Sequence, residues 1–343
     1  MSWGGMTEDL PSISIVIPTL NSAGTLDLCL QSILKQDYPK HKVEVIVADG
    51  GSKDMTLEIA EKYRPDKILC NPLKSGEAGK AVGVGAAQNE IIALIDSDNI
   101  LPTNDWLRRI VQPFKDILIA GSDPFCYTYR REDPLVTRYC ALLGMNDPLC
   151  LYLGNYDRYC YITGRWTNRQ VEAIDRGNYI KVKLDVMNIP TIGANGFLVR
   201  ADLVRKAYDK PYFFDVDVVY NLAKNGQIWF AKCKVGIIHL YARNVGTFLG
   251  KTYRRVRDYL FYKRHGLRRY PWRINRLKLL QFALFTVLLF PLVRDSLRGY
   301  AKFPERAWLF HAIACWIVLL TYGTKLILNG SIKSNDLEIV VEQ

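Results

Sequence analysis

The chain has 343 residues, of which 49% are hydrophobic and 23% are charged. This composition excludes a disordered chain, and the length is sufficient for an α/β core and a further module. The net charge is +12, but residues 251–278 alone hold eleven Lys or Arg and one acid. The rest of the chain is close to neutral, which argues against a nucleic-acid-binding protein and for one local anionic partner.

Residues 13–121 alternate between strand and helix patterns. Strands are predicted at residues 12–17, 43–48, 67–70 and 91–95, with helices beginning near Asn21 or Ser22 and after Ser52. Strands that alternate with helices predict an α/β fold with a parallel, doubly wound sheet. In such sheets ligands bind beyond the carboxyl ends of the strands.

The next part of the chain changes character. Residues 122–190 are rich in Tyr, which suits packing, sugar stacking or a membrane interface. A helix is predicted at 215–225, followed by two short strands at 227–231 and 235–239. These elements complete the predicted α/β domain, residues 1–245.

Two apolar segments follow the basic run. Residues 279–293 and 307–324 contain no charged side chain. As helices they would reach roughly 22 and 27 Å, against a hydrocarbon core of about 30 Å. We expect a short membrane hairpin over residues 279–328, with two in-plane helices or two core helices of a soluble domain as alternatives. Residues 246–278 form a basic amphipathic segment suited to anionic lipid at the cytoplasmic face, and residues 329–343 a tail.

The stretch IIALIDSDNI, residues 91–100, ends a buried strand with two acids, Asp96 and Asp98. Carboxylates at this spacing can hold Mg²⁺ or Mn²⁺ and leave positions for diphosphate oxygens. The alternative is an ordinary polar turn. A calcium loop is excluded because Ile100 and Leu101 stand where it needs an oxygen ligand and a glycine.

A further acid, Asp49, ends the second predicted strand in VEVIVADGGSKD. Its carboxylate could accept hydrogen bonds from a nucleobase or ribose, and an Asp before Gly-Gly could equally form only a turn. A dinucleotide fold is not indicated, because PTLNSAG follows the first strand in place of a G-x-G-x-x-G motif.

Four motifs in order resemble the inverting family 2 glycosyltransferases with a GT-A fold. They are ISIVIPTLN, VEVIVADGGSKD, GKAVGVGAAQNEIIALIDSD and FFDVDVVYNLAKNG, and the resemblance covers roughly residues 12–245. It implies a Rossmann-like, mostly parallel sheet and a nucleotide-sugar donor.

The resemblance also implies roles for individual residues. Asp49 stands where the family contacts the nucleobase, and Asp96 and Asp98 where it holds the metal and the donor diphosphate. Asp215 in FFDVDVV matches the catalytic base. His239 falls where many members supply a further metal ligand; without the resemblance it reads as a histidine of an apolar strand.

Four more residues are expected at the donor or acceptor. Pro18 and Lys80 are implied to lie on the nucleotide side. Asn195 and Gly196 of GANGF are expected in a loop near donor and acceptor, although GANGF could equally form only a turn.

The chain departs from the family pattern in several places. Gly50 replaces the second Asp of Asp-Asp-Gly, Phe214 replaces the Glu of the Glu-Asp pair, and Lys80-Ala81 replaces Arg-Asn. Asp217 could compete with Asp215 for the role of base, although the two residues point to different sides of a helix.

The C-terminal arrangement resembles archaeal membrane mannosyltransferases and a reduced cellulose synthase. This resemblance implies transfer of mannose from GDP-mannose to a polyprenyl- or dolichyl-linked acceptor. The Q-x-x-R-W motif of processive synthases is absent, which indicates that a single sugar is added. The alternatives are a UDP-sugar-dependent family 2 transferase, a D-x-D phosphatase and a non-enzymatic membrane-surface binding protein.

Overall fold

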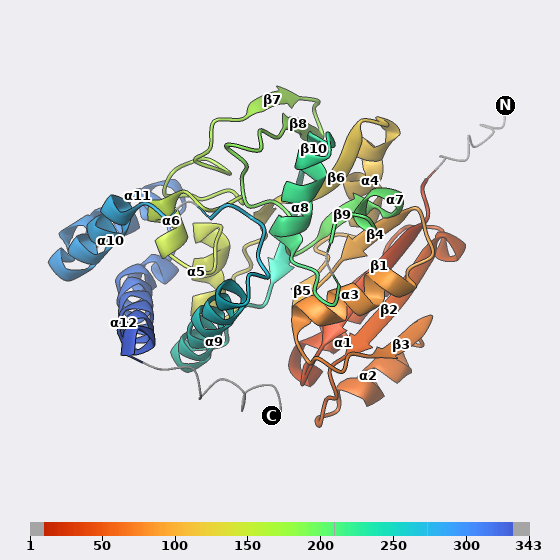
Figure 1. Cartoon of the computed structure of the whole chain (residues 1–343), viewed down its shortest axis with the longest axis horizontal. Coiled ribbons are helices and arrows are strands. Elements are labelled where there is room, and N and C mark those ends of the chain that lie inside the picture. Colours follow the sequence, from red (N-terminus) through yellow and green to blue (C-terminus); the bar gives the residue numbers. More distant parts are fainter. Residues whose placement is uncertain (1–9, 209, 273, 332–343) are drawn as a thin grey trace.

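A computed structural model describes residues 10–208, 210–272 and 274–331, with side chains up to Lys325. Its centre is a 10-stranded sheet in the order β3-β2-β1-β4-β9-β6-β10-β8-β7, with β5 paired to β10 off this path (Figure 1). The strands are β1 Ile13–Thr19, β2 Val43–Asp49, β3 Lys67–Cys70, β4 Ile91–Leu94, β5 Asn99–Ile100, β6 Ile119–Tyr127, β7 Glu172–Asp175, β8 Tyr179–Lys183, β9 Phe197–Arg200 and β10 Trp229–His239.

The sheet is mixed rather than mostly parallel. β3, β2, β1 and β4 are parallel neighbours, as the alternating pattern predicted. β9 then runs antiparallel to both β4 and β6, and β8 runs antiparallel to both β10 and β7. The two short strands predicted at 227–231 and 235–239 are one strand, β10. Its pairing with β6 shifts register between Cys233 and Gly236, so the interruption read from the sequence is a bulge within a strand.

Helices cover both faces of the sheet. The alternating side chains of β1 divide between two apolar cores: Ile13, Ile15 and Ile17 face one, and Val16 faces the other. The first core includes residues of α1 Ala23–Leu34, α2 Thr56–Lys62 and α4 Trp106–Val111, and the second includes residues of α3 Gly76–Ala86, α7 Ala201–Val204 and α8 Asp215–Lys224.

Helix α3 packs unusually close to β1 because glycines face the strand. A Cβ on Gly79 would lie 2.8 Å from the Cβ of Pro18, and one on Gly83 would lie 2.2 Å from Cγ1 of Val16. Larger side chains would push the helix away. This close packing holds Lys80, which follows Gly79, near the carboxyl ends of β1 and β4.

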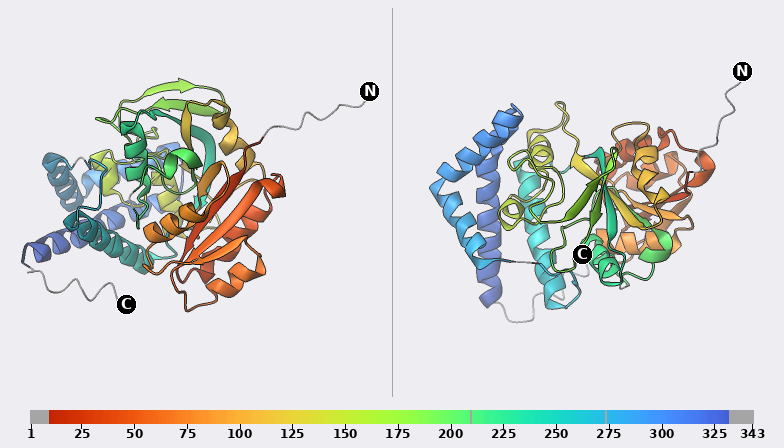
Figure 2. Two further views of the ribbon diagram at one scale, coloured as in Figure 1. Left: turned by 45° about the vertical axis from the view of Figure 1, so that its right-hand side comes forward. Right: turned by 90° about the horizontal axis from the view of Figure 1, so that it is seen from above.

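A third apolar core joins the C-terminal helices to the segment after β6. The segment after β6 contains α5 Leu135–Leu143 and α6 Leu149–Leu153, and the C-terminal helices are α9 Val245–Arg264, α10 Arg276–Leu288, α11 Phe290–Lys302 and α12 Phe310–Ser331. Short 3-10 helices span Lys40–Lys42, Gln112–Lys115 and Arg306–Leu309. Figure 2 shows α10, α11 and α12 together on the side of the molecule away from β1, β2 and β3.

The predicted membrane hairpin is not confirmed. The first apolar segment is two helices, α10 and α11, that meet at 90° at Leu289, whose φ is 59°. In the described part of the chain, one helical stretch, Arg306–Lys325, is long and apolar enough to cross a membrane, or two if the bent pair counts as one span. Residues 332–343 of the predicted tail lie outside the described residues.

Candidate functional site

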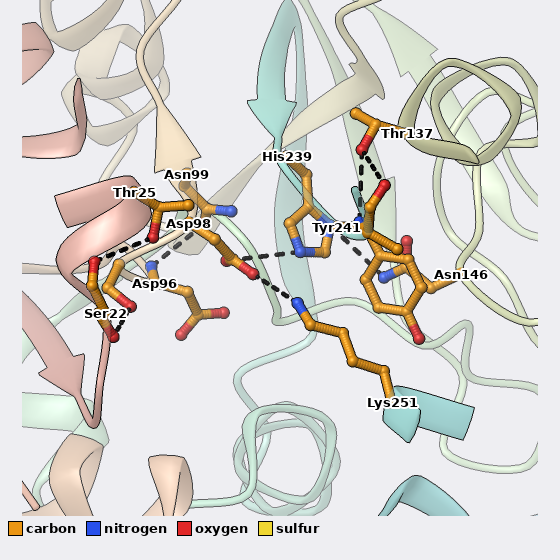
Figure 3. Close-up of polar contacts among 12 residues, drawn as sticks. Ser22, Thr25, Asp96, Asp98, Asn99, Thr137, Asn146, His239, Tyr241 and Lys251 are labelled. Atoms are coloured by element: carbon orange, nitrogen blue, oxygen red, sulfur yellow. Dashed lines mark hydrogen bonds and ion pairs between the residues drawn. The ribbon is translucent and has the colours of Figure 1, made fainter. Parts of the chain in front are cut away.

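The candidate site lies at the carboxyl ends of β1, β2 and β4, where β5 also meets β10. β5 follows the D-x-D stretch directly, and its Asn99 pairs with His239 at the end of β10. This short antiparallel pairing brings Asp98 and His239 together from positions far apart in the sequence (Figure 3). The register of two strands therefore builds this part of the site.

Asp98 lies between two cationic or basic groups. Its Oδ1 is 3.5 Å from Nε2 of His239, and its Oδ2 is 3.0 Å from Nζ of Lys251 on α9. Burial opposes the charge of Asp98, but His239 and Lys251 outweigh it and hold the pKa of this carboxyl well below its usual range. Asp98 is therefore a carboxylate at neutral pH.

Asp96 faces the other way, toward Lys80. The Nζ of Lys80 lies 3.3 Å from Oδ1 of Asp96 and donates a hydrogen bond of 2.7 Å to Oδ2 of Asp215. Lys80 is buried, yet the carboxylates of Asp215 and Asp96 more than offset the cost of burial and raise its pKa above the ordinary lysine value. Lys80 thus remains a cation that bridges the D-x-D stretch and the first residue of α8.

Asp215 has the electrostatics of a general base. Its Oδ1 is buried and has no hydrogen-bond partner among the described residues. Burial raises the pKa of Asp215 to about 7; Lys80 opposes this rise, while Asp96 and Glu77 add to it. A carboxyl that titrates near neutral pH, with one free oxygen, can accept a proton from a hydroxyl group.

Asp217, the competing candidate, has a different environment. Its carboxylate accepts hydrogen bonds from Nε and Nη2 of Arg268 and from the backbone N–H of Arg269. These contacts tie α8 to the segment after α9. The side chain therefore has a structural partner, whereas Asp215 on the other side of the helix faces the D-x-D stretch.

Asp49 lies in a tight loop that its own carboxylate organises. Oδ2 accepts from the backbone N–H groups of Gly51 and Ser52, both at 2.8 Å, and Oδ1 accepts from the hydroxyls of Thr19 and Ser52. The side chain is 5% exposed. This is the turn geometry that the sequence offered as the alternative reading. Pro18, also predicted at the nucleotide, lies at the end of β1 against Gly79.

The GANGF loop lies beside β5 and β6. Asn195 adopts a left-handed conformation with φ 51°, accepts from Nδ2 of Asn99 and donates to the hydroxyl of Tyr127. Gly196 has φ 90°, and a Cβ there would lie 2.7 Å from Cδ1 of Ile237. The loop is therefore a rigid, side-chain-bonded turn next to the D-x-D stretch.

A buried charge cluster supports this loop, and the sequence analysis missed it. Arg158 binds both oxygens of Asp123 and donates to the backbone carbonyls of Ala194 and Asn195. Lys232 lies 2.5 Å from the same Asp123, and both side chains are fully buried. The signal in the sequence is Lys232, which stands between the apolar residues Ala231 and Cys233 of the strand WFAKCKVGIIH.

The predicted metal site is assembled only in part. Asp98 and His239 offer a carboxylate and an imidazole that suit Mn²⁺. Asp96 faces Lys80 instead, and in the described residues no three His, Cys, Asp or Glu side chains lie close enough to hold an ion. Two cations explain this arrangement, because Lys80 attracts Asp96 and Lys251 attracts Asp98.

Comparison with known proteins agrees with the family indicated by the sequence. The family model described as "Glycosyl transferase family 2" matches residues 14–170. Glycosyltransferase AglE of Haloferax volcanii is 35% identical over 148 residues, which cover 41% of this chain and 48% of that protein. A dolichyl N-acetyl-alpha-D-glucosaminyl phosphate 3-beta-D-2,3-diacetamido-2,3-dideoxy-beta-D-glucuronosyltransferase of Methanococcus voltae is 27% identical over 111 residues, 31% of this chain and 34% of that protein.

Among the solved structures that align with nearly the whole chain is a mannosyltransferase. Mannosyltransferase PcManGT from Pyrobaculum calidifontis, in complex with GDP-Man and Mn²⁺, is 16% identical, and the alignment covers 94% of this chain and 80% of that one, with a TM-score of 0.49. A TM-score below 0.5 does not support an inference about substrate or metal. The matched region spans at most about half the length of the two curated relatives above.

Proposed function

We propose that this chain transfers a single sugar from a nucleoside diphosphate to an acceptor hydroxyl, with inversion of the anomeric configuration. Through residues 14–170 the chain belongs to the family 2 glycosyltransferases. The observation that carries this proposal is Asp215. It is a half-buried carboxyl with a pKa of about 7 whose buried Oδ1 has no hydrogen-bond partner among the described residues, and it lies one side chain away from the D-x-D stretch. We assign Asp215 the role of base in one direct displacement, which inverts the anomeric carbon.

In the proposed step, Oδ1 of Asp215 removes the proton from the acceptor hydroxyl. The hydroxyl oxygen attacks the anomeric carbon, and the nucleoside diphosphate leaves from the opposite face. Lys80 keeps Asp215 and Asp96 at fixed positions through its contacts of 2.7 and 3.3 Å. Its cation also keeps part of the Asp215 population ionised at neutral pH, because it opposes the effect of burial.

We propose that Asp98 and His239, with Asp96, hold Mn²⁺ or Mg²⁺ when the donor binds. The ion would neutralise the charge of the leaving diphosphate. The support is the donor chemistry of these side chains and the pairing of β5 with β10, which brings Asp98 and His239 to one edge. Lys251 occupies the side of Asp98 opposite His239 and is the cation that the metal must compete with.

For the donor, our best candidate is GDP-mannose, with a UDP-sugar as the alternative. We propose that the loop of Asp49 bounds the nucleobase pocket together with Pro18. All four hydrogen bonds of Asp49 are made within the protein, which favours a role in shaping this pocket over direct contact with the base. Asn195 and Gly196 would line the side where donor and acceptor meet.

For the acceptor, we propose a polyprenyl- or dolichyl-linked molecule at the cytoplasmic face of a membrane. The relative from Methanococcus voltae carries a dolichyl-linked substrate in its name. The basic run at residues 251–278 offers cations for the acceptor phosphates, and its Lys251 on α9 contacts Asp98. Residues 1–245 would be the transferase domain and residues 246–328 the membrane-associated part.

The test is a donor panel. GDP-mannose, UDP-glucose and UDP-N-acetylglucosamine are each incubated with polyprenyl phosphate and Mn²⁺, and released nucleoside diphosphate and glycolipid product are measured. We expect one donor to be used, with product of inverted configuration. A retained anomeric configuration would contradict the single-displacement proposal. Hydrolysis of simple phosphate esters without sugar transfer would instead support the D-x-D phosphatase.

A further inference from the structure

Helix α10 turns an apolar face away from the protein core. Its exposed large apolar side chains recur at helical spacing on one face; they are Leu277, Leu280, Leu284, Val287 and Leu288. Leu277 is the most exposed of them, at 75%. The opposite side, with Phe282 and Thr286, is buried. A surface helix normally presents its polar side to solvent, so an outward apolar face needs a partner.

Helix α11 continues this surface after the 90° bend. Phe290 is 75% exposed, and Val293, Leu297 and Tyr300 follow it at spacings of three or four residues. The inner side of α11 packs tightly, because a Cβ on Gly299 would lie 2.6 Å from the ring of Trp308. We call the outward side chains of the two helices the α10–α11 face.

The charges around the α10–α11 face are of one sign. In residues 276–325 every exposed charged side chain is a cation: Arg276, Lys278, Arg294, Arg298, Lys302 and Arg306. The two acids of this stretch, Asp295 and Glu305, are buried or half-buried and are paired with Tyr152 and Tyr129. An apolar face bordered by cations complements an anionic lipid surface, whereas a second copy of this chain would bring like charges together.

Helix α12 is held along its length by polar contacts with the rest of the protein. Nδ1 of His311 lies 2.7 Å from the hydroxyl of Tyr139, and the hydroxyl of Tyr322 donates to Asp147 at 2.7 Å. Near its C-terminal end, Nζ of Lys325 lies 4.1 Å from the ring centroid of Tyr253 on α9.

These contacts conflict with a transmembrane position for α12. Figure 2 shows α9 beside α12, and α9 carries Lys251, Arg254, Arg255, Arg257, Asp258, Lys263 and Arg264. If α12 crossed the bilayer in this arrangement, these charges would enter hydrocarbon at a large energetic cost. α10 and α11 have 13 residues each, so each is about 20 Å long, too short to cross a core of about 30 Å.

We infer that the chain docks on an anionic bilayer with the α10–α11 face inserted in the plane of the interface, and that no helix among residues 276–325 crosses the membrane. Phe290, Val293 and Leu297 enter the boundary between headgroups and acyl chains, and Arg294 and Arg298 contact lipid phosphates. This adds a mode of membrane contact to the proposed function, and its test requires no sugar transfer.

The first experiment measures vesicle binding of the full chain. Vesicles of phosphatidylcholine alone and of phosphatidylcholine with 30% phosphatidylglycerol are compared by co-sedimentation. We expect binding to the anionic vesicles that weakens with salt. The double substitution Phe290→Ser with Val293→Ser should lower the partition coefficient at least tenfold. The control, Ile117→Ser with Leu118→Ser, changes two exposed apolar residues of the transferase domain and should change it less than twofold.

Circular dichroism verifies that both double variants are folded. Unchanged binding of the folded α11 variant, or no binding of the wild type to anionic vesicles, would overturn the proposal. A concentration-dependent dimer in sedimentation velocity that is lost in the α11 variant, without vesicle binding, would also overturn it and would assign the face to a second copy.

The second experiment distinguishes docking from crossing. Lys302→Cys places a thiol at the end of α11, before α12, and Thr324→Cys places one in the C-terminal half of α12. Both are made in a Cys70→Ser background, which removes the exposed native thiol. In sealed inside-out membrane vesicles, an impermeant maleimide should label both positions from the side of the transferase domain. Labelling of only one position would show that α12 crosses the membrane and would overturn the inference.

Discussion

Nζ of Lys80 donates a hydrogen bond of 2.7 Å to Oδ2 of Asp215, although the two residues are 135 positions apart in the sequence. The contact joins α3 to the start of α8, and the same ammonium group reaches Asp96 at 3.3 Å. It leaves Oδ1 of Asp215 as the oxygen without a partner among the described residues. Lys80 therefore binds one oxygen of Asp215, and the other is left without a partner among the described residues.

The proposed role of Asp215 as base predicts a pH dependence of transfer. A base acts only when it is deprotonated, and burial raises the pKa of Asp215 to about 7. We therefore expect kcat/KM to fall about tenfold per pH unit below pH 7 and to level off above it. Initial rates from pH 5.5 to 8.5 check this. A flat profile across this range would show that Asp215 does not supply the titrating base.

Lys80→Met should move this profile to higher pH. Burial raises the pKa of Asp215 and the Lys80 cation opposes that effect, so its removal raises the pKa further. We expect the acid limb of kcat/KM to shift up by about one pH unit. Lys53→Met, at an exposed lysine near the site, is the matched control and should leave the profile in place. A shift to lower pH would contradict the assigned electrostatics.

Lys251→Gln should strengthen metal binding. The ammonium of Lys251 lies 3.0 Å from Oδ2 of Asp98, so a divalent cation must displace it. Its removal should tighten Mn²⁺ binding by roughly three- to tenfold, measured by electron paramagnetic resonance titration without substrate. Lys263→Gln, at an exposed lysine of the same helix, controls for net charge. Equal affinities in the two variants would contradict competition at Asp98.

Arg158→Met should destabilise the fold. The substitution leaves Asp123 buried with one of its two cations removed and frees the carbonyls of Ala194 and Asn195. Loss of one partner from a buried ion pair costs about 3–5 kcal/mol. Urea denaturation measures this change in the free energy of unfolding. Arg131→Met, at an exposed arginine, should cost no more than about 0.5 kcal/mol. Similar midpoints for both variants would show that the cluster is not needed for stability.

The strands and their polar ends could be predicted because period and burial are local properties of the sequence. β1, β2, β3 and β4 lie close to their predicted residues, and Asp49, Asp96 and Asp98 come at or just after carboxyl ends of strands. β9 was not predicted as a strand because FLVR shows no apolar–polar alternation: Phe197, Leu198 and Val199 are all buried. Its antiparallel insertion between β4 and β6, together with the antiparallel pairing of β8 with β10 and β7, makes the sheet mixed.

Side-chain partners were harder to predict than positions. Lys251 belongs to a basic run that reads as a membrane-facing segment, yet α9 turns this one lysine toward Asp98. The contact depends on the orientation of α9, which the third apolar core helps to fix through Phe248. The contacts of Lys80 with Asp215 and of Arg158 with Asp123 likewise depend on packing between distant segments, which local periodicity does not encode.

Asp215 is proposed above as the base of a glycosyl transfer. The most direct measurement is single-turnover transfer from the donor found in the panel, compared between wild type, Asp215→Asn and Asp217→Asn, with folding verified by circular dichroism. We expect Asp215→Asn to slow transfer by about 10²- to 10⁴-fold. Asp217→Asn removes the carboxylate that binds Arg268, so this variant should lose stability but keep transfer within about tenfold when folded. Near-normal transfer by folded Asp215→Asn would contradict the account.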